Sequence, residues 1–166
     1  MSLNDARNQR GGIMADLEEL KCRAINAATG EWVYGYPVPF SDSVSGWALV
    51  GDHFLTPDKG HIGTPEFEEV LNDTVCRFAG YTDYFNTALF EGDIILVEPD
   101  LYGVIRFGKH ASHISQDAKT GNGFYIEWLG ERADIYRTDI GYWMDADRAV
   151  IRGNIFNNPE LLEVRK

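Results

Sequence analysis

The chain has 166 residues, 44% of them hydrophobic and 13% aromatic, and its 15 basic and 26 acidic residues give a formal net charge of −11. This length suits one domain, or one domain built from two small subdomains, and it needs no disulfide or metal to fold. The acidic surface repels phosphate backbones, so we expect no nucleic-acid partner. We also expect no signal peptide, no membrane partner and a cytoplasmic location, because no run approaches the ~20 apolar residues of a membrane span.

The first part of the chain predicts a tail followed by a β-hairpin. We expect residues 1–13 to be an added tag or a disordered tail. Alternating apolar residues predict a strand over Leu20–Ala24, and the β-branched and aromatic run Trp32–Tyr36 predicts a second strand after a turn at residues 28–31. Prolines and small polar residues predict a loop from Pro37 to Gly46.

The second part predicts a set of short strands separated by turn residues. The nearly continuous apolar run Ile94–Val97 is typical of a strand with both faces covered. Further strands are expected over Gly103–Phe107, Gly123–Trp128 and Ala149–Arg152. We therefore expect a mainly β protein, at the border of α+β, whose residues 92–153 close into one small barrel. The predicted barrel core is Ile94, Leu96, Val104, Ile126 and Val150.

The end of the chain predicts a short helix. Asn158 is a preferred N-cap residue, Pro159 suits the first helical position, and Glu160 stands near the positive end of the helix dipole. We expect Leu161 and Leu162 to dock this helix on the barrel.

The two cysteines predict no disulfide and no metal site. Cys22 and Cys76 lie far apart in the sequence, each among apolar residues. In a chain without a secretion signal, this pattern favours two buried free thiols.

Three stretches that follow one another along the chain carry a resemblance to a known family. They are Lys21–Ala24 with Thr29–Gly35, Asp73–Val75 through Gly80 with Asp83 and Phe90–Ile94, and Val150–Phe156 with Asn158–Leu162. In these stretches the chain resembles the YopX family of phage and prophage proteins. It departs from the family pattern after Gly80, where Tyr81–Thr87 replaces the expected Leu and Asp-Lys-Asn-Gly hairpin.

The resemblance implies a phage or prophage origin and a division into two parts. The expected organisation is a tail over residues 1–13, an N-terminal β-rich subdomain over 14–88 and a C-terminal SH3-like barrel over 89–166. The resemblance implies no activity and no catalytic residues.

The strongest candidate for a metal site is a pair of histidines, His110 and His113. Zinc would need one or two more ligands, and the candidates fall in no standard ligand spacing, so we interpret both histidines as ordinary loop residues and expect no metal and no cofactor. These candidates are His53, His61, Cys76 and Asp117.

The candidates for catalysis are weak in the same way. Asp139, Asp145 and Asp147 gather near Trp143, as glycosidase carboxylates sometimes do, but a solvated acidic turn explains them in so acidic a chain. The turn at Gly92 explains Glu91 and Asp93, which cap or solvate it. No nucleophile motif frames the serines, which are Ser41, Ser43 and Ser45.

Three classes of function remain open. The first, which we favour, is a module for protein binding or assembly, with exposed aromatic residues such as Trp47 or Tyr84 contacting an unknown protein partner. The second is an acidic mimic of nucleic acid that inhibits a DNA-binding protein, and the third is a small hydrolase with an unrecognised site. The surplus of aromatic residues and edge strands also predicts a homo-oligomer. The bases expected on or beside strands are too dispersed for a nucleic-acid groove: Lys21, Arg23, Arg106, Lys109 and Arg152.

Overall fold

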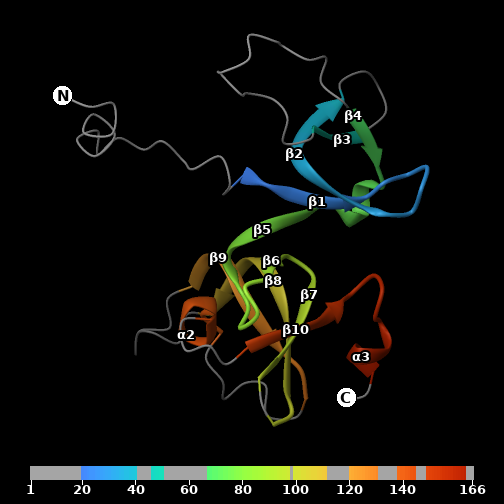
Figure 1. The fold of residues 1–166 in the computed structure, drawn as a ribbon. Helices are drawn as coiled ribbons and strands as arrows, with labels where there is room; N and C mark the ends of the chain where they lie inside the picture. Colours follow the sequence, from blue (N-terminus) through green and yellow to red (C-terminus); the bar gives the residue numbers. More distant parts are fainter. Residues whose placement is uncertain are drawn as a thin grey trace, which may run out of the picture.

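The computed structural model describes residues 20–40, 46–50, 67–97, 99–111, 120–130, 138–144 and 149–163. The chain is mainly β, as the sequence predicts, and its strands form two antiparallel sheets (Figure 1). The predicted tail over residues 1–13 falls in the part of the chain that is not described.

The first sheet has six strands in the order β4-β3-β2-β1-β5-β6, and the 3-10 helix η3 (Asn72–Thr74) precedes β5. Its strands are β1 (Cys22–Ile25), β2 (Trp32–Phe40), β3 (Gly46–Val50), β4 (Phe67–Val70), β5 (Cys76–Thr82) and β6 (Ala88–Phe90).

The second sheet has four strands in the order β10-β7-β8-β9. Helix α2 (Ile140–Met144) lies between β9 and β10 in the sequence, and helix α3 (Glu160–Glu163) follows β10. The strands are β7 (Asp93–Val97), β8 (Leu101–Ala111), β9 (Thr120–Trp128) and β10 (Ala149–Asn154).

The predicted first hairpin is confirmed, with β1 paired to β2. Asn26 closes its turn, because the side-chain Oδ1 accepts hydrogen bonds from the backbone N–H groups of Ala28 and Thr29 at 2.8 and 2.9 Å. Gly30 has a φ of 74°, a conformation that glycine adopts without steric cost.

The loop predicted from Pro37 to Gly46 was wrong in its first part, because β2 continues through both prolines to Phe40. Along this stretch β2 pairs with β3, as in the pairs Pro37–Leu49 and Pro39–Trp47, whereas β1 pairs only with residues 32–35 of β2. Proline lacks a backbone donor, so it is tolerated in a strand where one side needs no partner.

The main hydrophobic core lies against the second sheet, and β7 is buried on both faces as predicted. Of the predicted core residues only Ile126 belongs to the main cluster, because Ile94, Leu96 and Val104 are buried outside it and Val150 is only partly buried. In β10, Ala149 belongs to the cluster and Ile151 packs against it instead. A bulge in β10 after Ile151 shifts its register on β7, which alternation in the sequence does not reveal.

The prediction that residues 92–153 close into a barrel was wrong for the described residues, because β9 and β10 form the two edges of the second sheet rather than pairing with each other. Strands of the first sheet cover part of its core, because Ala79 from β5 and Leu89 from β6 belong to the same buried cluster as Ile95, Ile105 and Ile126. Strand β5 thus reaches from one half of the molecule to the other (Figure 1). The expected division of the chain after residue 88 stays a prediction.

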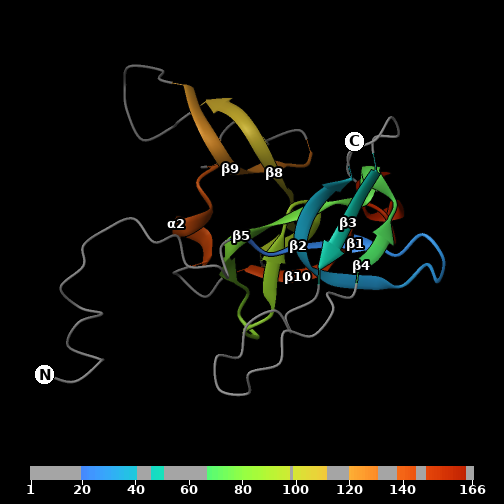
Figure 2. The same cartoon turned by 90° about the horizontal axis from the view of Figure 1, so that it is seen from above.

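Strands β8 and β9 extend past β7 as a two-stranded ribbon (Figure 2). The ribbon is tied to the first sheet, because the guanidinium carbon of Arg77 in β5 lies 3.7 Å from the ring centroid of Phe107 in β8. Phe107 also contacts Phe124 across the ribbon at 5.0 Å between ring centroids.

The C-terminal helix is confirmed as α3, but its cap differs from the prediction. The side-chain Oδ1 of Asn158 accepts a hydrogen bond from the backbone N–H of Asn154 at 3.3 Å and so holds the preceding turn. Among the described residues, no helix is both long and apolar enough to cross a membrane.

The packing of the second sheet predicts different outcomes for two alanine substitutions. In Gly103→Ala the new Cβ would overlap Ile126 Cγ2 and lie 2.8 Å from Trp128 Cε3, and both residues are buried in the core. Overpacking of this kind costs about 1–3 kcal/mol. We expect urea unfolding, followed by tryptophan fluorescence, to show that loss for Gly103→Ala.

Gly123→Ala in β9 is the matched control, because its Cβ would have no atom within 4 Å. We expect its free energy of unfolding to stay within ~0.5 kcal/mol of that of the parent protein. Equal losses for both variants would contradict the packing described here.

Candidate functional site

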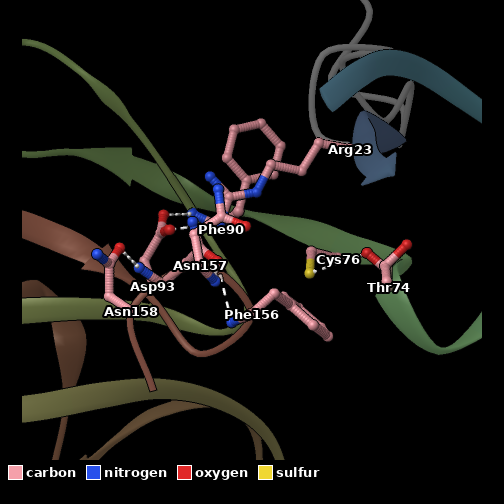
Figure 3. Close-up of polar contacts among 9 residues, drawn as sticks. Arg23, Thr74, Cys76, Phe90, Asp93, Phe156, Asn157 and Asn158 are labelled. Carbon is pink, nitrogen blue, oxygen red and sulfur yellow. Dashed lines mark hydrogen bonds and ion pairs between the residues drawn. The ribbon is translucent and has the colours of Figure 1, made fainter. Parts of the chain in front are cut away.

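A buried ion pair joins the two sheets. The guanidinium of Arg23 in β1 donates to Oδ1 of Asp93 at the start of β7, 70 residues away, and the side chains are 10% and 1% exposed (Figure 3). The other carboxylate oxygen of Asp93 accepts the backbone N–H of Phe90 at 2.8 Å. The predicted turn is confirmed by Gly92, whose φ is 83°, but Asp93 is buried and paired rather than solvated.

Aromatic rings enclose the arginine of this pair. The guanidinium carbon of Arg23 lies 4.6 Å from the ring centroid of Trp32 and 4.8 Å from that of Phe90. Such cation–π contacts strengthen when the cation is desolvated. Arg23 is therefore a buried structural cation: it lies in a strand, as predicted, but its charge is enclosed within the protein.

Burial also shifts the pKa values of Asp93 and of the Cys76 thiol beside the pair. It raises the pKa of Asp93, against the opposing effects of Arg23 and of the Phe90 N–H. Burial raises the pKa of the Cys76 thiol to about 11, and the nearby Arg23 offsets only part of that effect. The thiol donates a hydrogen bond to the carbonyl of Thr74 at 3.2 Å. A thiol that stays protonated is a poor nucleophile, so this cluster is suited to structure rather than to catalysis.

The turn after β10 packs against the same place on the first sheet. The ring of Phe156 meets the ring of Trp32 edge to face at 5.9 Å. Asn154 fixes this turn through its Oδ1, which accepts the backbone N–H groups of Phe156 and Asn157, both at 3.0 Å. The two sheets are thus joined by an ion pair and, beside it, an aromatic contact.

An apolar pocket of about 230 Å³ opens on the face of the first sheet that carries Arg23. The strand register places Tyr34 opposite Arg23, Arg23 opposite Cys76, and Phe78 opposite Phe90, so these side chains share one face. Ring centroids of Tyr34 and Phe78 each lie 5.7 Å from that of Phe90. The lining residues, which we call the aromatic pocket, are Lys21, Tyr34, Phe78, Ala88 and Phe90.

The turn between β5 and β6 presents two more aromatic rings, those of Tyr84 and Phe85. Their exposed fractions are 60% and 68%, and the rings contact each other at 5.2 Å. Asn86, next in the chain, has a φ of 64°, so the turn is tight. We call the pair Tyr84 and Phe85 the hairpin tip.

The buried carboxylate of Asp83 holds the hairpin tip rigidly. One oxygen accepts the backbone N–H groups of Phe85 and Thr87 at 3.0 and 2.9 Å, and the other accepts the N–H of Ile151 in β10 at 3.1 Å. The N–H of Tyr84 donates in turn to the carbonyl of Ala149 at 3.1 Å. The tip is therefore anchored on the second sheet.

The histidine candidates do not assemble within the described residues. The His110 ring stacks on Tyr125 with centroids 4.8 Å apart, and its Nδ1 lies 3.2 Å from the Gly108 carbonyl. Cys76 lies at the ion pair instead. Across the described ranges, no three His, Cys, Asp or Glu side chains gather as a metal site would require. The remaining candidates fall in undescribed segments: His53, His61, His113 and Asp117.

The carboxylate candidates are only partly visible. Trp143 is buried in the main core against Trp128, and Asp139 just precedes α2. Glu91 pairs with Arg77 at 3.1 Å, so it forms part of an exposed ion pair beside the turn. Asp145, Asp147 and the three serines Ser41, Ser43 and Ser45 belong to segments without a described position, as does the side chain of Trp47.

The aromatic pocket and Phe85 were missed by the sequence analysis, which had singled out Tyr84 alone at the tip. Alternation in β5 and β6 places Phe78 and Phe90 on one face, but their meeting with Tyr34 depends on strand order. The sequence feature that could have indicated an exposed aromatic pair is the departure from the family pattern at Tyr81–Thr87, where two adjacent aromatic residues occupy a turn.

The ion pair predicts a large difference between two arginine substitutions. Arg23→Met leaves Asp93 buried without its cation, which typically costs about 3–5 kcal/mol. Arg106→Met removes a pair with Glu127 at 2.7 Å whose side chains are 36% and 50% exposed, so we expect a loss of at most ~1 kcal/mol. Chemical denaturation measures both, and similar losses for the two variants would refute the structural role of Arg23.

The raised pKa of Cys76 predicts a pH dependence of stability. In the unfolded chain the thiol has its ordinary pKa of 9.0, whereas in the folded protein its pKa is about 11. The folded form then holds the proton more tightly than the unfolded form. The resulting contribution to the free energy of unfolding is fully present below the pKa of the unfolded chain, and it is lost as pH rises through the pKa of the folded protein. As the pH rises from the unfolded to the folded pKa of this thiol, we expect the free energy of unfolding to fall less for Cys76→Ala than for the parent protein. Urea unfolding at several pH values measures this difference. Parallel losses would show that Cys76 is not responsible.

The chain matches no protein-family model, and no curated protein matches it. Among solved structures, it is similar to the crystal structure of protein EF1440 from Enterococcus faecalis, with 21% sequence identity and a TM-score of 0.47. The match covers 86% of this chain and 96% of that chain. At this identity and TM-score, we assign neither a fold family nor an activity from the likeness.

Proposed function

We propose that the protein is a module for protein binding or assembly, and that its binding surface consists of the hairpin tip and the aromatic pocket. The observation that carries this proposal is the exposure of Tyr84 and Phe85, at 60% and 68%, on a turn held in place by hydrogen bonds to the buried residue Asp83. Aromatic anchors on a rigid support supply much of the binding energy in protein interfaces, because little conformational entropy is lost when they bind.

The chemistry of the surrounding residues supports binding rather than catalysis. The aromatic pocket is lined by three aromatic residues, an alanine and one lysine, so its walls are mostly apolar. The buried carboxylate of Asp93, three positions after the lining residue Phe90, is engaged by Arg23 and by a backbone N–H. A surface of this kind can bury an apolar side chain of a partner.

We further propose that the protein is a phage or prophage accessory protein of the YopX kind. The three stretches that carry the resemblance meet at the buried ion pair: Arg23 and Trp32 come from the first, Phe90 and Asp93 from the second, and Phe156 from the third. Matching residues that meet at one structural contact support an architecture shared between this chain and the family. Because these residues build a structural contact, the resemblance carries no implication for activity.

For the second half we propose an SH3-like architecture. This proposal is supported by the packing of β5 and β6 on the four-stranded sheet. These two strands add Ala79 and Leu89 to its core, as strands of a small, partly open barrel would. The bond from the Tyr84 N–H to the Ala149 carbonyl links this layer to the edge strand β10.

The test of the binding function is capture from cells in which the gene occurs naturally. Immobilised protein is compared with the double variant Tyr84→Ser/Phe85→Ser, and a captured protein is then purified and titrated. We expect the double variant to bind it at least about tenfold more weakly, the loss typical of an interface anchor.

The matched control is Leu71→Ser. Leu71 follows β4 of the first sheet, lies outside the proposed binding surface and is 48% exposed. This variant should bind like the parent. Equal binding by the tip variant, or equal losses in both variants, would overturn the assignment of the surface.

A further inference from the structure

The chain itself contains a side chain that matches the aromatic pocket in size and chemistry. Phe85 is 68% exposed, the largest exposed fraction among the large hydrophobic residues that the structure describes. The pocket measures about 230 Å³, and its walls are mostly aromatic. Apolar cavities of about 150 Å³ already hold benzene in proteins, so a phenyl ring fits within this volume.

The ring of Phe85 does not occupy the pocket of its own molecule. Phe85 and the lining residue Ala88 lie in one hairpin, three positions apart, and the turn between them is fixed by Asp83 and by the left-handed conformation of Asn86. Phe85 is exposed and is not among the residues that line the pocket, so the pocket of each molecule is open to a ring from another molecule.

We propose that a second copy of this chain is the occupant, with Phe85 of each copy inserted into the aromatic pocket of the other. This inference rests on the binding surface proposed above and names its partner. The tip and three of the pocket residues belong to the same hairpin, at its end and along its strands: Phe78, Ala88 and Phe90.

The arrangement closes because the contact is reciprocal. Two such hairpins lying antiparallel about a two-fold axis place each tip over the strands of the other, with an overlap of roughly 20 Å because Phe78 and Phe85 are seven positions apart. A two-fold contact uses the same patch on both subunits and ends in a dimer rather than a fibre.

Charge gives this dimer a distinctive salt dependence. Each copy has a formal net charge of −11, so two copies repel each other at low ionic strength. Added salt screens that repulsion, since the Debye length falls from about 30 Å at 0.01 M to about 3 Å at 1 M. Dimerisation of this chain should strengthen with salt, whereas binding of a basic partner protein would weaken.

The experiment is sedimentation equilibrium of the full chain over a concentration series at low and high salt. We expect a monomer–dimer equilibrium that tightens with salt. Phe85→Ser removes the inserted ring and Ala88→Trp fills the pocket that receives it, and each should weaken dimerisation at least about tenfold. Leu71→Ser should leave it unchanged, and circular dichroism melts identify any variant that fails to fold.

A mixture of Phe85→Ser and Ala88→Trp provides a second measurement. The first variant keeps an intact pocket and the second an intact tip, so the mixture retains one of the two contacts and should associate more tightly than either variant alone. A parent protein that stays monomeric at every salt and protein concentration, or a dimer indifferent to both variants, overturns the inference. In that case, tip-dependent capture of another protein would leave the proposed binding function standing.

Discussion

The ion pair between Arg23 and Asp93 is the contact on which the relation between the two sheets depends. Both charges are removed from water, so each requires the other, and the hydrogen bond from Phe90 and the rings of Trp32 and Phe90 surround them. Replacing such a pair with apolar residues often costs little stability, which suggests that its value lies in specificity. Only one relative placement of β1 and β7 satisfies both groups.

The same constraint explains why the aromatic pocket exists. Phe90 lies over the guanidinium on one side and contacts Tyr34 and Phe78 at the pocket, so the residue that covers the buried cation also forms the pocket lining. The structural centre and the proposed binding surface therefore share one side chain. A substitution at Phe90 would alter both, whereas Ala88 and Phe85 belong to the binding surface alone.

The sequence predicted those strands and turns that are determined by neighbouring residues in the chain. The apolar run of β7, the hairpin of β1 and β2 and the glycine turn before Asp93 each depend on residues a few positions apart. The burial of Arg23 could not be predicted in this way, because an arginine between Cys22 and Ala24 has the spacing of a solvent-facing position in a half-buried strand. Its partner is 70 residues away, and strand order decides the contact. The same holds for the pocket, which needs β2 and β6 on the two sides of β1 and β5.

The hydrogen bond from the Ile151 N–H to Asp83 has a consequence for the order of events during synthesis. When the ribosome has just made the turn, the nascent chain still lacks β10, and the carboxylate of Asp83 has no third donor. The aromatic rings at the tip acquire their fixed position only after Ile151, which follows Asp83 by 68 residues, has emerged. A truncated translation product would carry the same two rings on a loosely held turn, so the completed protein and its fragments would differ in what they offer to neighbouring molecules.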